Sequence, residues 1–213
     1  MRIYAISGLG ADKRVFDFLT LEYEVIPVDW ISPKKNEKIK DYSKRLIIKY
    51  NIDQDIEFGL LGVSFGGLVA IEMSKLLNPK FTILISSVET KHELRWLFRI
   101  VGKLRLIELI PKKFLDPPRY LAHYMFGTKQ KELLNSILDD TDLKITKWAI
   151  KELINWNNVS KISNLIKIGG TNDKMLPSKR DHTILIKKGE HFMIIDKADE
   201  ISEIINREIK LYR

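Results

Sequence analysis

Short apolar runs alternate with amphipathic segments along the first part of the chain. Four runs are predicted as buried strands: residues 2 to 6, 23 to 28, 57 to 63 and 81 to 85. Between them, apolar residues recur at helical spacing, most clearly over 34 to 50 and 68 to 77. This order of strand, helix and strand predicts an α/β fold with a parallel sheet, right-handed crossovers and helices on both faces.

The strand signal disappears between residues 88 and 158 and is replaced by a helical pattern, broken at Pro111 and Pro117-Pro118. Strand-like runs resume at 166 to 170 and 182 to 186, and a final helix is predicted over 197 to 211. The sequence therefore predicts one domain over residues 1–213. Its mostly parallel sheet has about six strands, and a helical insertion at 88–158 follows the fourth strand.

The composition agrees with a single globular domain: of 213 residues, 45% are hydrophobic and 30% are charged. No apolar run is long enough to cross a bilayer. The first eight residues carry one basic side chain and too short an apolar run for a secretory signal, so a cytoplasmic location is expected. The absence of cysteine excludes disulfides, thiolate metal sites and a cysteine nucleophile.

The chain is basic, with a formal net charge of +8. The basic residues are spread along it without a stacking platform of aromatics, so no nucleic-acid partner is expected. One segment, Lys91 to Lys113, carries seven lysines and arginines against two glutamates. Three interpretations remain open for it: a solvated helix face, an electropositive entrance for anionic substrates, and a surface that contacts a membrane or an acidic carrier protein.

The sequence Gly-Val-Ser-Phe-Gly-Gly at 62 to 67 lies between a predicted strand and a predicted helix. The pattern G-x-S-x-G carries weight only in that context, where a sharp turn leaves the Ser64 hydroxyl exposed at the end of the strand. Small residues at Gly62 and Gly66 let the strand and helix approach closely. The alternative is a glycine-rich loop in some other α/β protein.

A serine hydroxyl needs a base to become a nucleophile at neutral pH, and histidine is suited to this role. His191 is the best placed of four histidines, because it follows the last predicted strand beside Gly189. His182 begins a predicted strand, while His92 and His123 lie in the helical insertion. Each of these three is more typical of a surface or packing histidine.

A catalytic histidine also needs an acceptor on its second ring nitrogen. Asp173 is the leading candidate, since it follows the strand at 166 to 170 and lies at the carboxyl edge of the sheet with Ser64. Glu89 and Asp196 are alternative acids. Asp173 could instead be a turn residue that satisfies its own loop.

The order Ser64, Asp173, His191 on a strand-turn-helix serine resembles the α/β-hydrolase superfamily, from the first strand of the chain to its last helix. The resemblance implies a three-layer fold in which 88–158 corresponds to the cap. Residues 7 to 10 are similar to the family's loop after its third strand, with serine in place of the usual histidine. The resemblance further implies an oxyanion hole formed by the backbone N–H groups of Leu9 and Phe65, and a compact member without the family's first two strands.

The expected function is a serine hydrolase that cleaves a small-molecule carboxylic ester or thioester through an acyl-enzyme on Ser64, without cofactor or metal. An apolar acyl group is favoured by eight residues of the insertion, most of which also suit a core: Trp96, Leu97, Phe98, Phe114, Tyr120, Tyr124, Met125 and Phe126. Two alternatives remain, because this fold hosts several chemistries: a lyase or C–C bond hydrolase with the same triad, and a non-catalytic ligand-binding protein.

Overall fold

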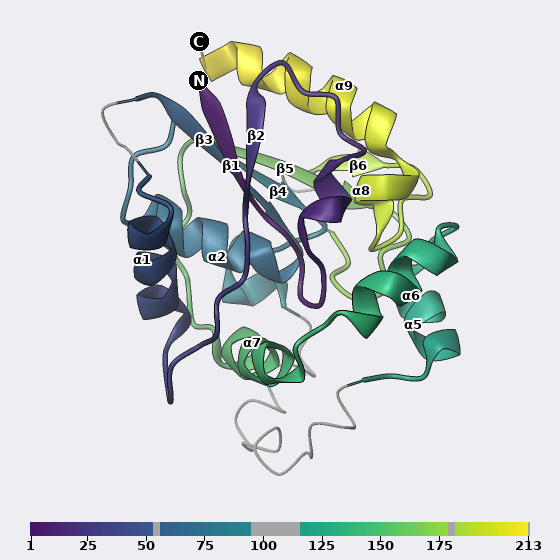
Figure 1. Cartoon of the computed structure of the whole chain (residues 1–213). Coiled ribbons are helices and arrows are strands. Elements are labelled where there is room, and N and C mark those ends of the chain that lie inside the picture. Colours follow the sequence, from purple (N-terminus) through teal and green to yellow (C-terminus); the bar gives the residue numbers. More distant parts are fainter. Residues whose placement is uncertain (53–55, 95–115, 179–181, 213) are drawn as a thin grey trace.

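Six parallel strands form one sheet in the computed structural model of the chain, which describes residues 1–52, 56–94, 116–178 and 182–212 (Figure 1). The strands are β1 (Arg2–Ile6), β2 (Glu24–Val28), β3 (Phe58–Val63), β4 (Phe81–Ile85), β5 (Leu165–Gly170) and β6 (Ile184–Ile186). Their order across the sheet is β2-β1-β3-β4-β5-β6. The predicted number of strands and their parallel direction are confirmed.

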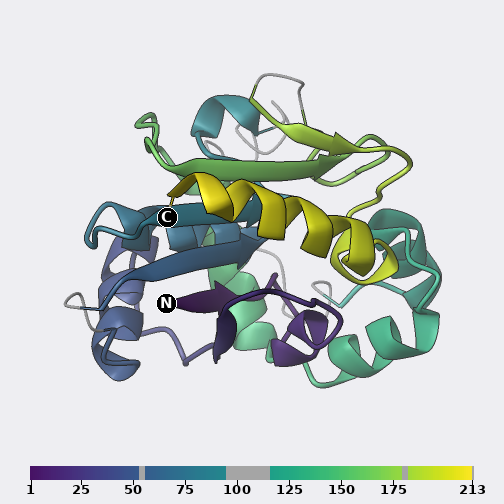
Figure 2. The ribbon, with the colours of Figure 1, turned by 90° about the horizontal axis from the view of Figure 1, so that it is seen from above.

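Helices cover both faces of this sheet. They are α1 (Ile39–Lys49), α2 (Phe65–Ser74), α5 (Arg119–Phe126), α6 (Lys131–Asp139), α7 (Leu143–Asn155), α8 (Met193–Asp196) and α9 (Ala198–Glu208). Short 3-10 turns span Lys13–Phe16, Lys91–Glu93 and Ile209–Tyr212. Helix α9 lies along one face, while α1, α2 and α7 lie on the opposite side of the sheet (Figures 1 and 2).

The alternation of side chains along each strand builds two hydrophobic cores. In β1, Tyr4 and Ile6 pack with α1, α2 and α7, whereas Ile3 and Ala5 pack with α8 and α9. Strand β3 divides in the same way, with Leu60 in the first core and Leu61 in the second. Because both faces are covered, β1, β3 and β4 read as nearly continuous apolar runs rather than alternating ones.

Two predicted boundaries are corrected by the structure. The helix predicted from residue 34 begins at Ile39, because residues 34 to 38 turn first: Glu37 accepts a hydrogen bond from Lys34 N, and Asn36 has a positive φ of 59°. The last strand begins at Ile184, because His182 has a φ of 53°, which is incompatible with an extended strand. His182 is exposed to solvent.

The described elements between β4 and β5 are the 3-10 turn Lys91–Glu93 and helices α5, α6 and α7. Most of the basic segment predicted at 91 to 113, together with Trp96, Leu97, Phe98 and Phe114, lies outside the described residues. Within the described ranges, none of the helices is both long enough and apolar enough to cross a membrane.

Candidate active site

Ser64 occupies the sharp turn between β3 and α2. Its backbone has φ 51° and ψ −121°, a conformation that costs a non-glycine residue about 1–3 kcal/mol and that the surrounding structure must impose. Two hydrogen bonds hold it: Ser64 N donates to Ile85 O at 2.9 Å, and the Ser87 hydroxyl donates to Ser64 O at 2.7 Å. The turn is therefore fixed by residues at the end of β4, the neighbouring strand.

Gly66 explains why the serine motif requires small residues. A Cβ atom on Gly66 would lie 2.2 Å from Ser7 O and 2.4 Å from Ile6 O, both backbone atoms at the end of β1. A Cβ on Gly62 would lie 2.5 Å from Gly67 Cα. Helix α2 consequently starts in direct contact with the adjacent strand, and this contact aims its first N–H groups at the carboxyl edge of the sheet.

Gly66→Ala is expected to destabilise the protein, because Ile6 is paired with β2 and β3 and its carbonyl cannot move without disturbing the sheet. Overpacking of this kind should cost about 3 kcal/mol. For a chain of this length, that corresponds to roughly 6–12 °C in the thermal midpoint, measured by circular dichroism. Gly8→Ala is the matched control, since its Cβ would approach Ser64 Cβ only to 3.3 Å. Equal midpoints for the two variants would contradict the close contact at Gly66.

The structure brings His191 and Asp173 to Ser64. His191 Nε2 lies 2.9 Å from Ser64 Oγ, and His191 Nδ1 lies 3.0 and 2.9 Å from the two carboxylate oxygens of Asp173. With the ring proton on Nδ1, the histidine donates to Asp173 and accepts from the serine hydroxyl. Both side chains are almost fully buried, at 2% and 0% exposure, so the pair is shielded from water.

Asp173 is held as a carboxylate by its neighbours. Burial by itself would raise the pKa of Asp173, but the hydrogen bond and charge of His191, with the N–H groups of Leu176 and Met175, lower that pKa below its ordinary value. Both N–H groups donate to Oδ1 at 2.9 Å. Asp173 thus orders its own loop, as the turn interpretation expected, and also contacts the histidine.

The alternative candidates lie elsewhere. Among the histidines, His92 is exposed and His123 is hydrogen-bonded to Asn135 at 2.8 Å. Glu89 accepts a hydrogen bond from Ile162 N, and Asp196 accepts from Lys129 N. These carboxylates are therefore engaged with backbone groups away from the imidazole of His191.

The loop after β1 faces Ser64 and is braced by side chains. The Ser7 hydroxyl donates to Ala11 O at 2.8 Å, and the Trp30 indole N–H donates to Ser7 Oγ at 3.0 Å. From the other side, the Thr141 hydroxyl donates to Gly10 O at 3.0 Å. Ser7 therefore helps to hold the loop in place.

Sequence reasoning missed Trp30 and Thr141. The position of Trp30 could have been noticed in the sequence, because it follows the carboxyl end of β2, and ligands of parallel sheets bind at that edge. No sequence pattern points to Thr141, because it is 131 residues away from Gly10, its hydrogen-bond partner in the loop.

A pocket of about 710 Å³ opens beside Ser64. Its walls come from five parts of the chain: the loop after β1, the start of α2, the end of α5, α7, and the segment after Asp173. The lining residues are Leu9, Ser64, Phe65, Tyr124, Met125, Phe126, Ile150, Leu153, Lys174, Met175, Leu176 and Pro177. All but Ser64 and Lys174 are apolar or aromatic. The Phe126 ring also lies 5.8 Å from the His191 ring, so the apolar wall continues to the base.

Lys174 is the one charged side chain among these lining residues. Its Nζ lies 2.6 Å from Glu190 Oε1 and 4.8 Å from the centre of the Tyr124 ring. Its charge is therefore balanced locally, and the described pocket suits an uncharged, apolar group.

Comparison by sequence finds no relative, since no protein-family model matches the chain and no curated protein is significantly similar to it. Comparison by structure finds many. An esterase from Exiguobacterium antarcticum superimposes with a TM-score of 0.73 at 16% identity, covering 99% of this chain and 92% of its own. An esterase from Thermogutta terrifontis gives a TM-score of 0.71 at 12% identity, covering 100% of this chain and 90% of its own.

A thioesterase is also among the similar structures. The RedJ thioesterase from the prodiginine biosynthetic pathway in Streptomyces coelicolor gives a TM-score of 0.67 at 14% identity, covering 98% of this chain and 90% of its own. At these identities the similarity is one of fold.

Proposed function

We propose that this chain, which has the α/β-hydrolase fold of its structural neighbours, is a serine hydrolase that cleaves a carboxylic ester or thioester through an acyl-enzyme on Ser64. The observation that carries the proposal is the continuous hydrogen-bonded series Ser64, His191, Asp173 at the wall of an apolar pocket. The 2.9 Å distance between Ser64 Oγ and His191 Nε2 also argues against a purely ligand-binding protein.

In the proposed reaction, Ser64 Oγ attacks the acyl carbonyl carbon while His191 Nε2 takes the hydroxyl proton. Asp173 stays ionised, holds the imidazole in the required tautomer and stabilises the imidazolium that forms. His191 then gives the proton to the leaving alcohol or thiol as the tetrahedral intermediate collapses. A water molecule, deprotonated by the same nitrogen, then attacks the acyl carbon. As the bond between that carbon and Ser64 Oγ breaks, His191 returns the proton to Oγ and the carboxylic acid is released.

Two backbone N–H groups are proposed to stabilise the oxyanion. Phe65 is the first residue of α2, so its N–H has no acceptor in a preceding helical turn, and it lies where the helix dipole favours negative charge. Leu9 lines the same pocket from the loop braced by Ser7. Each donor of this kind is worth on the order of a hundredfold in rate.

The acyl group is proposed to lie in the apolar pocket. Three of the aromatic and apolar residues expected to contact it, Tyr124, Met125 and Phe126, line this pocket, whereas Tyr120 does not and is 76% exposed. Helices α5 and α7, proposed as parts of a cap, supply one side of the wall. The pocket selects for apolar character and is compatible with either leaving group, an alcohol or a thiol.

The proposal is tested by labelling and by a substrate series. A fluorophosphonate probe should modify the wild-type protein at a single peptide containing Ser64, as mapped by mass spectrometry. Across p-nitrophenyl esters, octanoate should exceed acetate in kcat/KM by at least about tenfold, because each buried methylene contributes about 0.8 kcal/mol. Matched acyl thioesters assayed in parallel distinguish the leaving groups. Absence of labelling at Ser64 would contradict the hydrolase, while a preference for acetate would contradict the apolar acyl site.

A further inference from the structure

A second hollow, of about 770 Å³, lies on the far side of α7, between that helix and the turn that precedes α1. Six of its lining residues are lysines, and we call this surface the lysine groove: Lys34, Lys35, Lys38, Lys144, Lys147 and Lys151. The first three come from the segment before α1, and the other three lie on α7 at a spacing that places them along one side of the helix. Two distant parts of the sequence therefore form the two sides of the groove, which we call its banks.

The two acidic residues of the groove offset only part of the charge of its six lysines. Glu37 is buried, and its carboxylate lies 2.9 Å from Arg45 Nε. Glu152 is also buried; it accepts a hydrogen bond from Ile39 N at 2.9 Å and lies 3.5 Å from Lys38 Nζ. Both carboxylates are buried, whereas Lys34, Lys35 and Lys144 are exposed. The surface presented to solvent is strongly positive.

The groove continues beyond these lysines. A neighbouring hollow of about 540 Å³ shares Lys38, Glu152 and Asn155 with it and adds Lys40 and Lys75. Its remaining acid, Glu72, is buried and accepts hydrogen bonds from Lys75 Nζ and from the indole N–H of Trp156. Lys75 is therefore paired, and Lys40 is the exposed lysine that this hollow adds. The positive surface is thus elongated, which suits an extended anionic partner better than a single small ion.

The described residues of the groove disfavour two ways of binding an extended anion: insertion into a membrane and stacking on single-stranded nucleic acid. Membrane insertion needs exposed apolar side chains, and Val159 is the only large exposed hydrophobic residue that lines either hollow. Single-stranded nucleic acid is bound by stacking on exposed aromatic rings. Trp148 and Trp156 are 8% and 6% exposed, and their indole N–H groups donate to Glu37 O and Glu72 Oε1.

We propose that the lysine groove docks an acidic ridge of a partner protein, such as a helix that carries several carboxylates. The concave shape accepts a protruding element, and lysines on both banks can pair with carboxylates on both of its sides. Such pairs lie at a solvated rim, so they would accelerate association and make it sensitive to salt.

The groove lies close to the catalytic pocket but does not depend on it. Helix α7 supplies lysines to one surface, while its Ile150 and Leu153 line the pocket beside Ser64. Trp148, at the groove, packs edge-on against Phe65 at 5.7 Å between ring centres. A docked partner would therefore lie about one helix diameter, roughly 10 Å, from the pocket. Docking can be tested whether or not Ser64 is a nucleophile.

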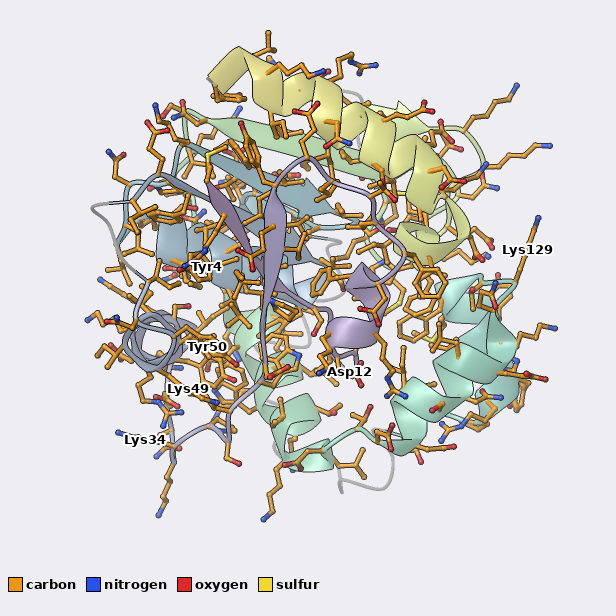
Figure 3. The ribbon with its side chains drawn as sticks, turned by 45° about the horizontal axis from the view of Figure 1, so that its top comes forward. Tyr4, Asp12, Lys34, Lys49, Tyr50 and Lys129 are labelled. Atoms are coloured by element: carbon orange, nitrogen blue, oxygen red, sulfur yellow. The ribbon has the colours of Figure 1, made fainter. Side chains whose placement is uncertain are left out.

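The test compares two triple variants with the same change in net charge. The groove variant is Lys34→Glu, Lys35→Glu, Lys144→Glu; the control is Lys129→Glu, Lys131→Glu, Lys187→Glu, at exposed positions away from the groove. Lys34 and Lys129 lie at opposite sides of the molecule (Figure 3). Binding of fluorescent poly-L-glutamate is measured by anisotropy at 50 and 200 mM salt, with circular dichroism to verify folding.

The wild type should bind poly-L-glutamate and lose most of that affinity at the higher salt. The groove variant should bind at least about tenfold more weakly, and the control less than about threefold more weakly. Carbodiimide cross-linking of the wild type should attach glutamate residues of the probe to groove lysines. Equal losses in the two variants would overturn the proposal in favour of diffuse net charge. Tighter, groove-dependent binding of a 20-base-pair DNA duplex or of anionic phosphatidylglycerol vesicles would also overturn it, in favour of that partner.

Discussion

Replacement of Ser64 by alanine is expected to abolish ester hydrolysis and fluorophosphonate labelling while leaving the fold intact. The substitution removes only Oγ, the atom 2.9 Å from His191 Nε2, and retains the Cβ and the hydrogen bond from Ser64 N to Ile85 O. Removal of the nucleophile from a serine triad lowers kcat by about 10⁴-fold or more. Initial rates on a p-nitrophenyl ester, with gel detection of the fluorescent probe, measure both effects.

Ser86→Ala is the matched control for that experiment. Ser86 follows β4 as Ser64 follows β3, has a similar φ of 48°, and is completely buried. Among the residues that the structure describes, its hydroxyl has no hydrogen-bond partner, so no base is in place to activate it. Ser86→Ala should retain labelling and activity. Retained labelling in Ser64→Ala would instead locate the reactive serine elsewhere.

Asp173→Asn is expected to lower kcat by about 10⁴-fold through the wrong histidine tautomer. The asparagine Oδ1 can still accept from Met175 N and Leu176 N, so its amide N–H₂ is turned toward His191 Nδ1. That nitrogen must then accept a hydrogen bond, the ring proton moves to Nε2, and the imidazole can no longer accept the serine proton. Steady-state kinetics, with circular dichroism as the check on folding, measure the loss.

Asp196→Asn and Glu89→Gln are the controls for Asp173, because both acids bond to backbone N–H groups instead of His191. Each should keep activity within about threefold of the wild type, because the amide retains an oxygen that can accept from the same backbone N–H groups. A loss in either variant comparable to that of Asp173→Asn would reassign the acid.

The lowered pKa of Asp173 also determines how stability and activity should depend on pH. Because the folded-state pKa lies below the ordinary value of 3.8, the ionised carboxylate contributes stability that is fully present above that value and is lost as the pH falls through the lower folded-state pKa. Asp173 should remain ionised wherever a histidine can act as base. Asp173→Asn should therefore reduce activity across the neutral range. Its free energy of unfolding, measured by denaturant titration at several pH values, should also fall less steeply than that of the wild type as the pH drops below 3.8.

Much of the fold could be predicted from the sequence, because burial of both faces of the sheet requires strands that are almost continuously apolar. Strands β1, β3 and β4 are apolar runs of the expected length, and their alternation with helical periods permits essentially one sheet direction. The end of β3 at Ser64 was readable for a local reason: only glycine fits at Gly66, where backbone atoms of β1 approach within 2.4 Å of any added Cβ. Boundaries at residues 34 and 182 were wrong, because positive-φ residues end or delay elements without leaving a hydrophobic signal.

The sequence by itself determined the α/β architecture, the serine turn, and a short set of candidate bases and acids, since each follows from local spacing along the chain. Only the tertiary structure decided which candidates meet. Ser64 and His191 are 127 residues apart, and their contact depends on how β3, β5 and β6 align at one edge. The brace of Ser7 by Trp30 and the two banks of the lysine groove depend likewise on packing between distant segments. Hydrophobic periodicity specifies which face of an element is buried, but not which polar side chains are brought together when those faces pack.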